Sequence, residues 1–485
     1  MKTIKDKLHL ILVGMGLILY ILAFTIGAFG QTITYNSKKI TYSKLGDIVV
    51  TVNDANKTQI PFKKRTSMPT AAEVLVEYKK ILSSTPIVIP PIVVPPATSF
   101  IEIGNGSGWL TIDGSKLGLT GINQIKIKAG TYSGIDIKNF NQSQRINIVN
   151  KGIVNITENV ITENINNLSI SGSGEPSIKY GFSFKNNRVR AIKMYGKMNN
   201  ITIEKMSFVN VGDWCIAGEN SNGKDFAYKG TAETRNENFK ILYCYFENCG
   251  TIAFGGTVKV NDGEDSGFYK GVEIANNIFI NSDYMGSAVS FSNVQDYDVH
   301  DNIVDNVNAK TDTHNGIFSM QGNGKFYNNK LTNFQGNAIR MWLYSRGKEP
   351  ATNEIYNNIV FNTRKYSAFE LQGFSSHLWA GKTTFANARI FNNTVGRMNT
   401  SKDWEGQILD LYNYDGALEY YNNLGFELNR VGKQTTDMIN GNGDSKPPRP
   451  SETELIKTNK YFQNWQDAVA DLTSLKSKIA GVGAQ

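Results

Sequence analysis

Three phrases in the middle of the chain repeat one order of apolar and polar residues: YDVHDNIVDN (297–306), GKFYNNKLTN (324–333) and NEIYNNIVFN (353–362). In each phrase, apolar and polar residues alternate, an Asn interrupts the alternation, and a second Asn follows four residues later. A short loop and a second apolar segment come next. One such unit cannot bury its apolar face alone, whereas stacked copies can. The pattern therefore predicts a stack of repeated β-strand units.

The repeat extends from residue 206 to residue 423 when the phrases are aligned. Positions equivalent to the first Asn are occupied by Met206, Cys244, Asn277, Asn302, Asn329, Asn358, Asn393 and Asn423. A second Asn lies four residues after the first six of these, at 210, 248, 281, 306, 333 and 362. Asn side chains stacked about 4.8 Å apart can hydrogen-bond one to the next, which compensates for burying an amide at a turn. We therefore expect a buried Asn ladder between β-strands, since the period-two pattern excludes helical repeats.

The segment GWLTIDGSKLGLTGINQIKIKAGTYSGIDIKNF (108–140) consists of short alternating runs separated by Gly turns. It resembles the first rungs of right-handed parallel β-helix proteins of the pectate-lyase-like superfamily, and most of all exported proteins of Bacteroidetes-type bacteria. The resemblance covers roughly 100–435. It implies an all-β fold, a right-handed single-stranded parallel β-helix (a solenoid), and action on a polysaccharide.

Motifs of particular families within this superfamily are absent from the sequence. The NTD, DD and GHG motifs of polygalacturonases do not occur, and the acidic NDGED (261–265) resembles a loop turn rather than the calcium-binding cluster of pectate lyases. The resemblance therefore predicts the fold more specifically than the activity. We predict no certain cofactor, and calcium is the one that the resemblance leaves open.

The first thirty residues indicate export. A basic start with three Lys precedes an apolar run at 10–29, and Ala28-Phe29-Gly30 places small residues where a signal peptidase reads them. The run is also nearly long enough to cross a bilayer, so residues 1–30 are predicted to be a signal peptide or an uncleaved membrane anchor. Either alternative predicts a bacterial protein in the extracellular space, the periplasm or at the cell surface, with membrane contact only through residues 10–29.

The remaining organisation follows from local patterns. Residues 31–84 form a small N-terminal region with strand-like alternation followed by helical spacing, and the paired prolines of residues 85–98 predict a stiff linker. The parallel β-helix is expected at 99–440. Helical spacing around YFQNWQDAVADL predicts a short C-terminal helical cap within 441–485.

Composition narrows the classes of function. The 485 residues include 45 Gly and only 12 Pro, as in turn-rich β structure. The net charge of +8 is spread along the chain, which argues against nucleic acid and is compatible with an acidic glycan as partner. The three cysteines, Cys215, Cys244 and Cys249, are expected to be small apolar filler in the stack rather than metal ligands.

Two outward rows of side chains can be read from the second apolar segments. When the inward residues are aligned, the first row is Ser290, Ser319, Arg340, Glu370 and Asp410, and the second is Ser292, Gln321, Trp342, Gln372 and Tyr412. Neighbours within a row should lie about 4.8 Å apart. A cation, carboxylates, amides and aromatic rings side by side are what recognition of a sugar chain requires.

Several residues could carry chemistry at this surface. His314 could act as base or acid with Asp312 orienting it, or could be a hydrogen-bonding residue at the edge of a turn. Arg340 could bind a uronate bidentately, or could form only a surface ion pair with Glu370. Further predicted groups are Tyr344 on the same face, Arg346 and Lys348 in the following loop, and His377 and Trp379 in a loop that could close over the groove.

Two enzymatic hypotheses use these groups. In a polysaccharide lyase, Arg340 would neutralise the uronate carboxylate while His314, Tyr344 or a loop Lys removed the C5 proton. In a glycoside hydrolase, two carboxyls would flank the bond, Glu370 with either Asp410 or Asp312. The sequence favours the lyase slightly. A glycan-binding or purely structural surface or virion β-helix is the non-enzymatic alternative.

Overall fold

The computed structural model describes residues 31–35, 38–45, 49–52, 59–62, 69–84, 99–218, 235–255, 269–345, 349–373, 385–414, 416–429, 439–442, 454 and 457–484. The predicted leader (1–30), the Pro-rich linker (85–98) and the NDGED turn (261–265) lie outside these residues. No helix in the described ranges is long and apolar enough to cross a membrane. The chain divides into two compact units, 1–97 and 98–485.

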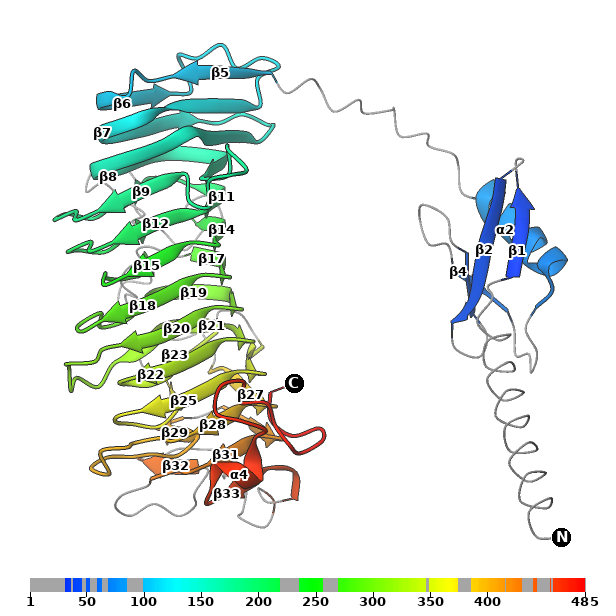
Figure 1. The fold of residues 1–485 in the computed structure, drawn as a ribbon, viewed down its shortest axis with the longest axis vertical. Coiled ribbons are helices and arrows are strands. Elements are labelled where there is room, and N and C mark those ends of the chain that lie inside the picture. The colour runs from blue at the N-terminus through cyan, green and yellow to red at the C-terminus, as the bar shows by residue number, and fades with distance from the viewer. Residues whose placement is uncertain are drawn as a thin grey trace, which may run out of the picture. The chain divides into compact units, whose positions relative to one another are not determined.

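The N-terminal unit is a small antiparallel sheet packed on one helix (Figure 1). Its elements are β1 (Gln31–Tyr35), β2 (Lys38–Leu45), β3 (Val49–Val52), β4 (Gln59–Pro61) and α2 (Ala71–Ser84). Thr70 and Glu73 cap the helix reciprocally, because each backbone N–H bonds the other side chain, at 2.8 and 3.4 Å. Tyr42, Val52 and Val74 are buried between sheet and helix. The strand and helix patterns predicted here are confirmed.

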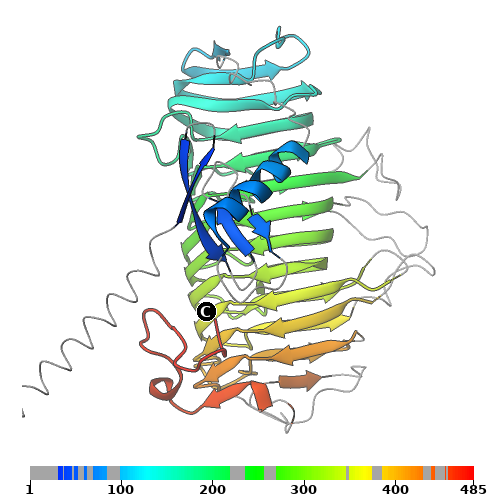
Figure 2. The same cartoon turned by 90° about the vertical axis from the view of Figure 1, so that its right-hand side faces the viewer.

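The larger unit is built almost entirely of parallel strands, which lie one above another in both views (Figure 1; Figure 2). Four strands begin it: β5 (Phe100–Ile103), β6 (Ser107–Asp113), β7 (Gln124–Phe140) and β8 (Ile146–Ser171). Strand β8 bends and pairs with three later strands, β9 (Phe182–Lys185), β10 (Ile192–Tyr195) and β11 (Asn199–Glu204). From there on, paired strands lie two or three places apart in the chain. The all-β fold with stacked parallel strands is confirmed.

The pairings form three ladders. Ladder 1 continues from β11 through β14 (Asn236–Leu242), β17 (Tyr269–Ala275), the ends of β19 (Val289–His300) and β21 (Gly316–Tyr327), β24 (Thr352–Tyr356), β27 (Asn387–Phe391) and β30 (Leu418–Tyr421). Ladder 2 continues from β9 through β12 (Met206–Val209), β15 (Tyr245–Glu247), β18 (Ile278–Ser282), β20 (Ile303–Val307), β22 (Lys330–Phe334), β25 (Ile359–Thr363), β28 (Thr394–Gly396), β31 (Leu424–Phe426) and β33 (Lys460–Phe462).

Ladder 3 continues from β10 through β13 (Ile216–Gly218), β16 (Ile252–Gly255), the starts of β19 and β21, β23 (Asn337–Leu343), β26 (Phe369–Gly373), β29 (Leu409–Tyr412) and β32 (Ile439–Asn442). One strand from each ladder makes a rung. Inward residues of all three ladders form one continuous apolar core. Within it, Phe208 and Phe246 stack at 4.8 Å, and the three cysteines are buried free thiols, as expected for filler.

The predicted Asn ladder lies at the corner between ladders 1 and 2, and we call this corner the Asn corner. From Asn277 to Asn423, each ladder Asn donates its backbone N–H and its side-chain Nδ2–H to Oδ1 of the next, at 2.8–3.1 Å. Asn459, which the alignment missed, accepts from Asn423 and extends the series by one rung. All of these Asn side chains are buried. The buried ladder is confirmed.

The second Asn of each repeat has a different role. At 210, 248, 281, 306, 333 and 362 the backbone has φ between 46° and 62°, a left-handed conformation that Asn tolerates better than most residues. These amides form an exposed row, in which Asn248 donates to Asn210 at 2.8 Å and Asn362 donates to Asn333 at 2.7 Å. Backbone conformation at the end of each ladder-2 strand therefore explains this second repeat.

The C-terminal segment differs from the expected helical cap. In the described part of 459–484, helix is confined to α4 (Trp465–Ala468), because the apolar residues there contact the outer side of ladder 2 instead of lining one helix face. Val469 and Leu475 pack with Phe361 and Phe426 there. The backbone N–H of Ala484 donates to the Thr394 hydroxyl at 2.9 Å. The segment thus covers an apolar flank of the last rungs.

Candidate functional site

The outward rows predicted from the sequence exist on ladder 3. Pairing places Ser290, Ser319, Arg340, Glu370 and Asp410 in one register column. Gln321, Trp342, Gln372 and Tyr412 form the adjacent column. Ser292 does not continue this second column, because the register shifts after Phe291. The strand alignment made from the sequence is otherwise confirmed.

A pocket of about 320 Å³ opens over these columns. It is lined by His314, Arg340, Glu370, Gln372, Trp404, Glu405, Asp410 and Tyr412. Strands of ladder 3 carry the five residues from Arg340 to Gln372 and from Asp410 to Tyr412 in this list. Loops at the corner between ladders 2 and 3 carry His314, Trp404 and Glu405. We call this second corner the loop corner. The pocket therefore combines charged groups held on rigid strands with groups carried on loops.

Glu370 is one of two buried acids of the pocket, the other being Asp410. Its Oε1 accepts from Arg340 Nε at 2.6 Å, and its Oε2 lies 3.0 Å from His314 Nε2. Burial alone would raise the pKa of Glu370, but the hydrogen bond from His314 and the charge of Arg340 outweigh burial, so the pKa is lowered. Glu370 is thus an ionised carboxylate held between two donors.

His314 is held in place by an aromatic ring and an amide. Its imidazole stacks on the Tyr366 ring, with centroids 3.9 Å apart and planes within 7°. Its Nε2 lies 2.9 Å from Asn337 Oδ1 in addition to Glu370, and Arg340 donates to its backbone carbonyl at 3.1 Å. Neither Tyr366 nor Asn337 was predicted from the sequence. The three residues lie on different rungs, and the separations from His314 in the sequence do not match the repeat, so the pattern gave no reason to place them together.

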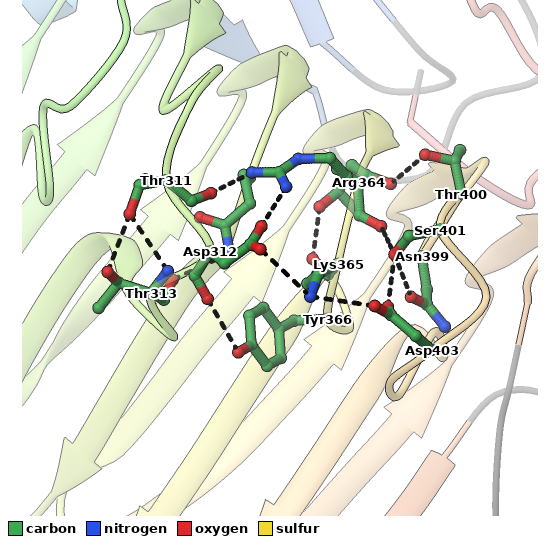
Figure 3. A network of polar contacts seen from close by, with 12 residues as sticks. Thr311, Asp312, Thr313, Arg364, Lys365, Tyr366, Asn399, Thr400, Ser401 and Asp403 are labelled. Carbon is green, nitrogen blue, oxygen red and sulfur yellow. Dashed lines mark hydrogen bonds and ion pairs between the residues drawn. The ribbon is translucent and has the colours of Figure 1, made fainter.

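Asp312 does not orient His314, so this prediction is wrong. Its carboxylate forms ion pairs with Arg364 and, at 3.7 Å, with Lys365 (Figure 3). The reason is that residues 311–313 turn outward, toward the loop that carries Arg364 and Lys365. Asp312 does not line the pocket, and the proposed pairing of Asp312 with Glu370 as catalytic carboxyls is also not found among the pocket-lining residues.

The polar network of Figure 3 joins three loops of the loop corner. Lys365 contacts Asp403 at 3.0 Å as well as Asp312, and Ser401 donates to the Arg364 carbonyl at 2.7 Å. The Tyr366 hydroxyl donates to the Asp312 carbonyl at 3.4 Å. The hydrogen bond from Lys365 and that from Ser401 lower the pKa of Asp403, the Ser401 bond having the larger effect. The network braces the loops that present His314 and Trp404.

Arg340 is located as predicted but is already engaged. Its charge is balanced by Glu370, and its guanidinium carbon lies 4.8 Å from the centre of the Trp342 ring. Trp342 and Gln321 do not line the pocket, whereas Gln372, Asp410 and Tyr412 do. The local field around Arg340 is therefore much less positive than a free guanidinium would create.

Tyr344 was predicted to face the groove, and this prediction is wrong. Strand β23 ends at Leu343, so the alternation stops and the Tyr344 ring lies in the interior, fully buried. Its hydroxyl donates to Asn293 Oδ1 at 2.9 Å. It cannot reach a substrate as a base. The predicted residues Arg346, Lys348, His377 and Trp379 lie outside the described residues.

Glu405 and Trp404 belong to the pocket and were missed. Among the described residues, Glu405 Oε2 is buried and has no hydrogen-bond partner. Burial, with a smaller contribution from the charge of Glu370, raises the pKa of Glu405. Trp404 is 47% exposed and meets the Tyr366 ring edge-on at 5.6 Å. A Trp-Glu pair in the long turn before the Asp410 strand was the signal that could have identified them.

The arrangement offers acid–base chemistry without an evident metal site. Within the described ranges, no group of three or more His, Cys, Asp or Glu side chains is placed to hold a metal ion. The sequence matches no protein-family model and no curated protein. The assignment of function therefore depends on the geometry of this pocket.

Proposed function

We propose that the pocket hydrolyses a glycosidic bond of an extracellular polysaccharide, with Glu405 as the general acid and Glu370 as the base or nucleophile. The observation that carries this proposal is that two carboxyls lining one pocket have pKa values shifted in opposite directions. Glycoside hydrolysis needs one protonated and one ionised carboxyl. Asp410, the next residue in the Glu370 column, is the third carboxyl of the pocket.

The proposed step is balanced by these two groups. Glu405 gives its proton to the glycosidic oxygen as the bond to the anomeric carbon breaks. The Glu370 carboxylate then either takes a proton from the attacking water or forms the bond to the anomeric carbon itself. In the second case, water that gives its proton to the Glu405 carboxylate displaces Glu370 and completes hydrolysis. Arg340 and His314 keep Glu370 ionised and oriented before the step, since both contact its carboxylate.

Aromatic side chains support a sugar as substrate. Trp404 and Tyr412 are 47% and 44% exposed and line the same pocket as the carboxyls. Exposed rings beside hydrogen-bonding acids suit the flat apolar faces and the hydroxyls of a sugar. A polymer is the natural substrate of an open pocket on a long flat ladder.

The wider setting of the proposal is a right-handed, single-stranded parallel β-helix of the pectate-lyase-like kind, exported by a bacterium. The regular return of the chain to the same three ladders supports the β-helix, and the right-handed rule for parallel crossovers supports its hand. The basic and apolar residues of 1–30 support export, with the choice between cleaved leader and anchor open.

Elimination at a uronate is the second candidate. It is favoured by the presence of a cation and an imidazole, Arg340 and His314, in one pocket. It ranks second because Glu370 already balances Arg340, so a uronate carboxylate would meet a weakly positive site.

The test is incubation of the protein with polygalacturonate, alginate and xylan. We expect new reducing ends without the ultraviolet absorbance of an unsaturated uronate. Equal growth of both signals would replace the hydrolase with a lyase. Binding with neither signal, on any of the three polymers, would leave only a glycan-binding role.

A further inference from the structure

We infer that the loop corner carries a second glycan-binding site, centred on Trp214 and Tyr284. This inference rests on the proposed function, because the two sites would bind one polymer chain. The second site is a pocket of about 380 Å³ formed by three successive loops. Its lining residues are Val211, Gly212, Asp213, Trp214, Asn248, Cys249, Gly250, Thr251, Ser282, Tyr284 and Met285.

The two aromatic residues of this pocket are open to solvent. Trp214 is 41% exposed and Tyr284 is 70% exposed. The Arg190 guanidinium carbon lies 4.5 Å from the centre of the Trp214 ring. Arg190 covers and steadies the indole. Large rings on such an exposed loop lose their contact with water when a flat apolar ligand face binds to them.

The charges of this pocket largely cancel, so its rings and hydroxyl partners would dominate binding. Arg190 Nε lies 3.4 Å from Asp213 Oδ2, so cation and carboxylate offset each other. Asp213 and Asn248 also line the pocket and offer oxygen and amide groups to hydroxyls. Aromatic rings with hydroxyl partners and little net charge fit the uncharged face of a sugar better than a phosphate or a basic peptide.

The second site and the candidate active site lie along one edge of the molecule. Four rung steps separate their central strands, from β16 through β19, β21 and β23 to β26. At about 4.8 Å a step, the separation is about 19 Å. A polymer lying along the ladder can contact both sites at once, whereas a trisaccharide cannot.

Affinity electrophoresis of Glu405→Gln protein in gels containing polygalacturonate, alginate or xylan tests this inference, because that variant should bind the polymer without cutting it. We expect one polymer to retard the protein. Adding Trp214→Ala or Tyr284→Ala should raise the dissociation constant about tenfold, since each removes one stacking ring. With Glu405 intact, both variants should cut the trisaccharide of that polymer at the wild-type rate.

Matched controls are Trp109→Ala and Tyr243→Ala, because Trp109 and Tyr243 are also exposed aromatic residues, at 44% and 49%, and line neither pocket. They should leave retardation unchanged. The second site is wrong if the Trp214 and Tyr284 variants migrate like their parent, or if no polymer retards the protein. Cleavage of a polymer with normal retardation of these variants would keep the hydrolase alone. Retardation lost in these variants, without cleavage by the wild type, would keep the second site alone.

Discussion

Two corners of the same rungs follow opposite rules. At the Asn corner, a residue with positive φ is followed by a buried Asn in rung after rung, as at Asn328-Asn329 and Asn357-Asn358. At the loop corner, the connections differ on successive rungs, from 335–336 to 397–408. The first corner repeats one set of hydrogen bonds, whereas the second carries His314, Trp404 and Glu405.

The difference separates stability from chemistry along one chain. At a repeated corner, the hydrogen-bonding groups of one rung are satisfied by the same groups of the neighbouring rung, so every rung supports the next. A corner that varies is free to place unlike groups side by side over a rigid floor. Substitutions at the Asn corner should therefore change stability, and those at the loop corner should change activity.

The largest expected effect is on activity at the loop corner. Glu405→Gln should lower kcat about a thousandfold, because the amide cannot give a proton to the leaving oxygen. The midpoint of thermal unfolding should stay within a few degrees of wild type. Glu354→Gln, on ladder 1, is the matched control and should keep full activity. Retention of more than a tenth of wild-type kcat by Glu405→Gln would exclude Glu405 as the acid.

A large effect on stability is expected at the Asn corner. Asn329→Ala should lower the free energy of unfolding by about 3 kcal/mol, because the buried donors of Asn302 and the Val299 carbonyl lose their partner. Urea unfolding measures it. Asn333→Gly, in the exposed row, keeps the positive φ and should cost less than about 1 kcal/mol. Equal losses in the two variants would contradict the distinction between the buried and exposed rows.

A smaller effect should distinguish positioning from chemistry. Tyr366→Ala removes the ring on which His314 stacks and should lower kcat about tenfold, while Tyr366→Phe keeps the ring and should restore most of the activity. Steady-state kinetics measures both. If Tyr366→Phe were as impaired as Tyr366→Ala, the hydroxyl bond to Asp312 would be the important contact instead.

The smallest expected effect concerns the pH values at which activity falls on the acidic and alkaline sides. Glu370 must be ionised, and its pKa is lowered, so the acidic limb should fall below the ordinary value of 4.5. Glu405 must be protonated, and its pKa is raised, so the alkaline limb should lie above that value. Burial is the main cause of the raised pKa of Glu405, and the charge of Glu370 adds a smaller part, so in Glu370→Gln the alkaline limb of any residual activity should move only slightly to lower pH. An alkaline limb of the wild type at or below 4.5 would show that a different group is the acid.

The pH dependence of stability follows from the same two shifts. The lowered pKa of Glu370 stabilises the fold above the unfolded pKa, and this contribution is lost as pH falls through the folded pKa. The raised pKa of Glu405 acts in the opposite sense, because its contribution is lost as pH rises through its folded value. Acidification should therefore weaken the rungs around Glu370 first.

The sequence predicted the parts of the molecule that repeat. The Asn ladder and the column from Ser319 to Asp410 follow from period-two spacing and stacking, which leave little freedom in register. Asn459 escaped the alignment because it precedes a ladder strand outside the repeated phrase. The helical spacing near the C-terminus was misleading, since its apolar residues contact the flank of ladder 2.

The candidate site was predictable on the strands and not on the loops. Arg340, Glu370 and Asp410 could be placed because each occupies an outward strand position. The contact of Tyr366 with His314 depends on two loops of different length, and so does the burial of Glu405. The conformation of these loops depends on how neighbouring rungs pack. That packing leaves no periodic pattern of apolar and polar residues in a single sequence.

The Asn ladder has a direction. From Asn277 onward, the buried donors of each ladder Asn are satisfied by an oxygen that lies later in the chain, up to Asn459 among the described residues. A chain emerging from its N-terminus, as in synthesis or export, would therefore always have one incomplete rung at its growing end. Each new rung would complete the hydrogen bonds of the rung before it. The segment that carries Asn459 would then complete those of Asn423, late in assembly.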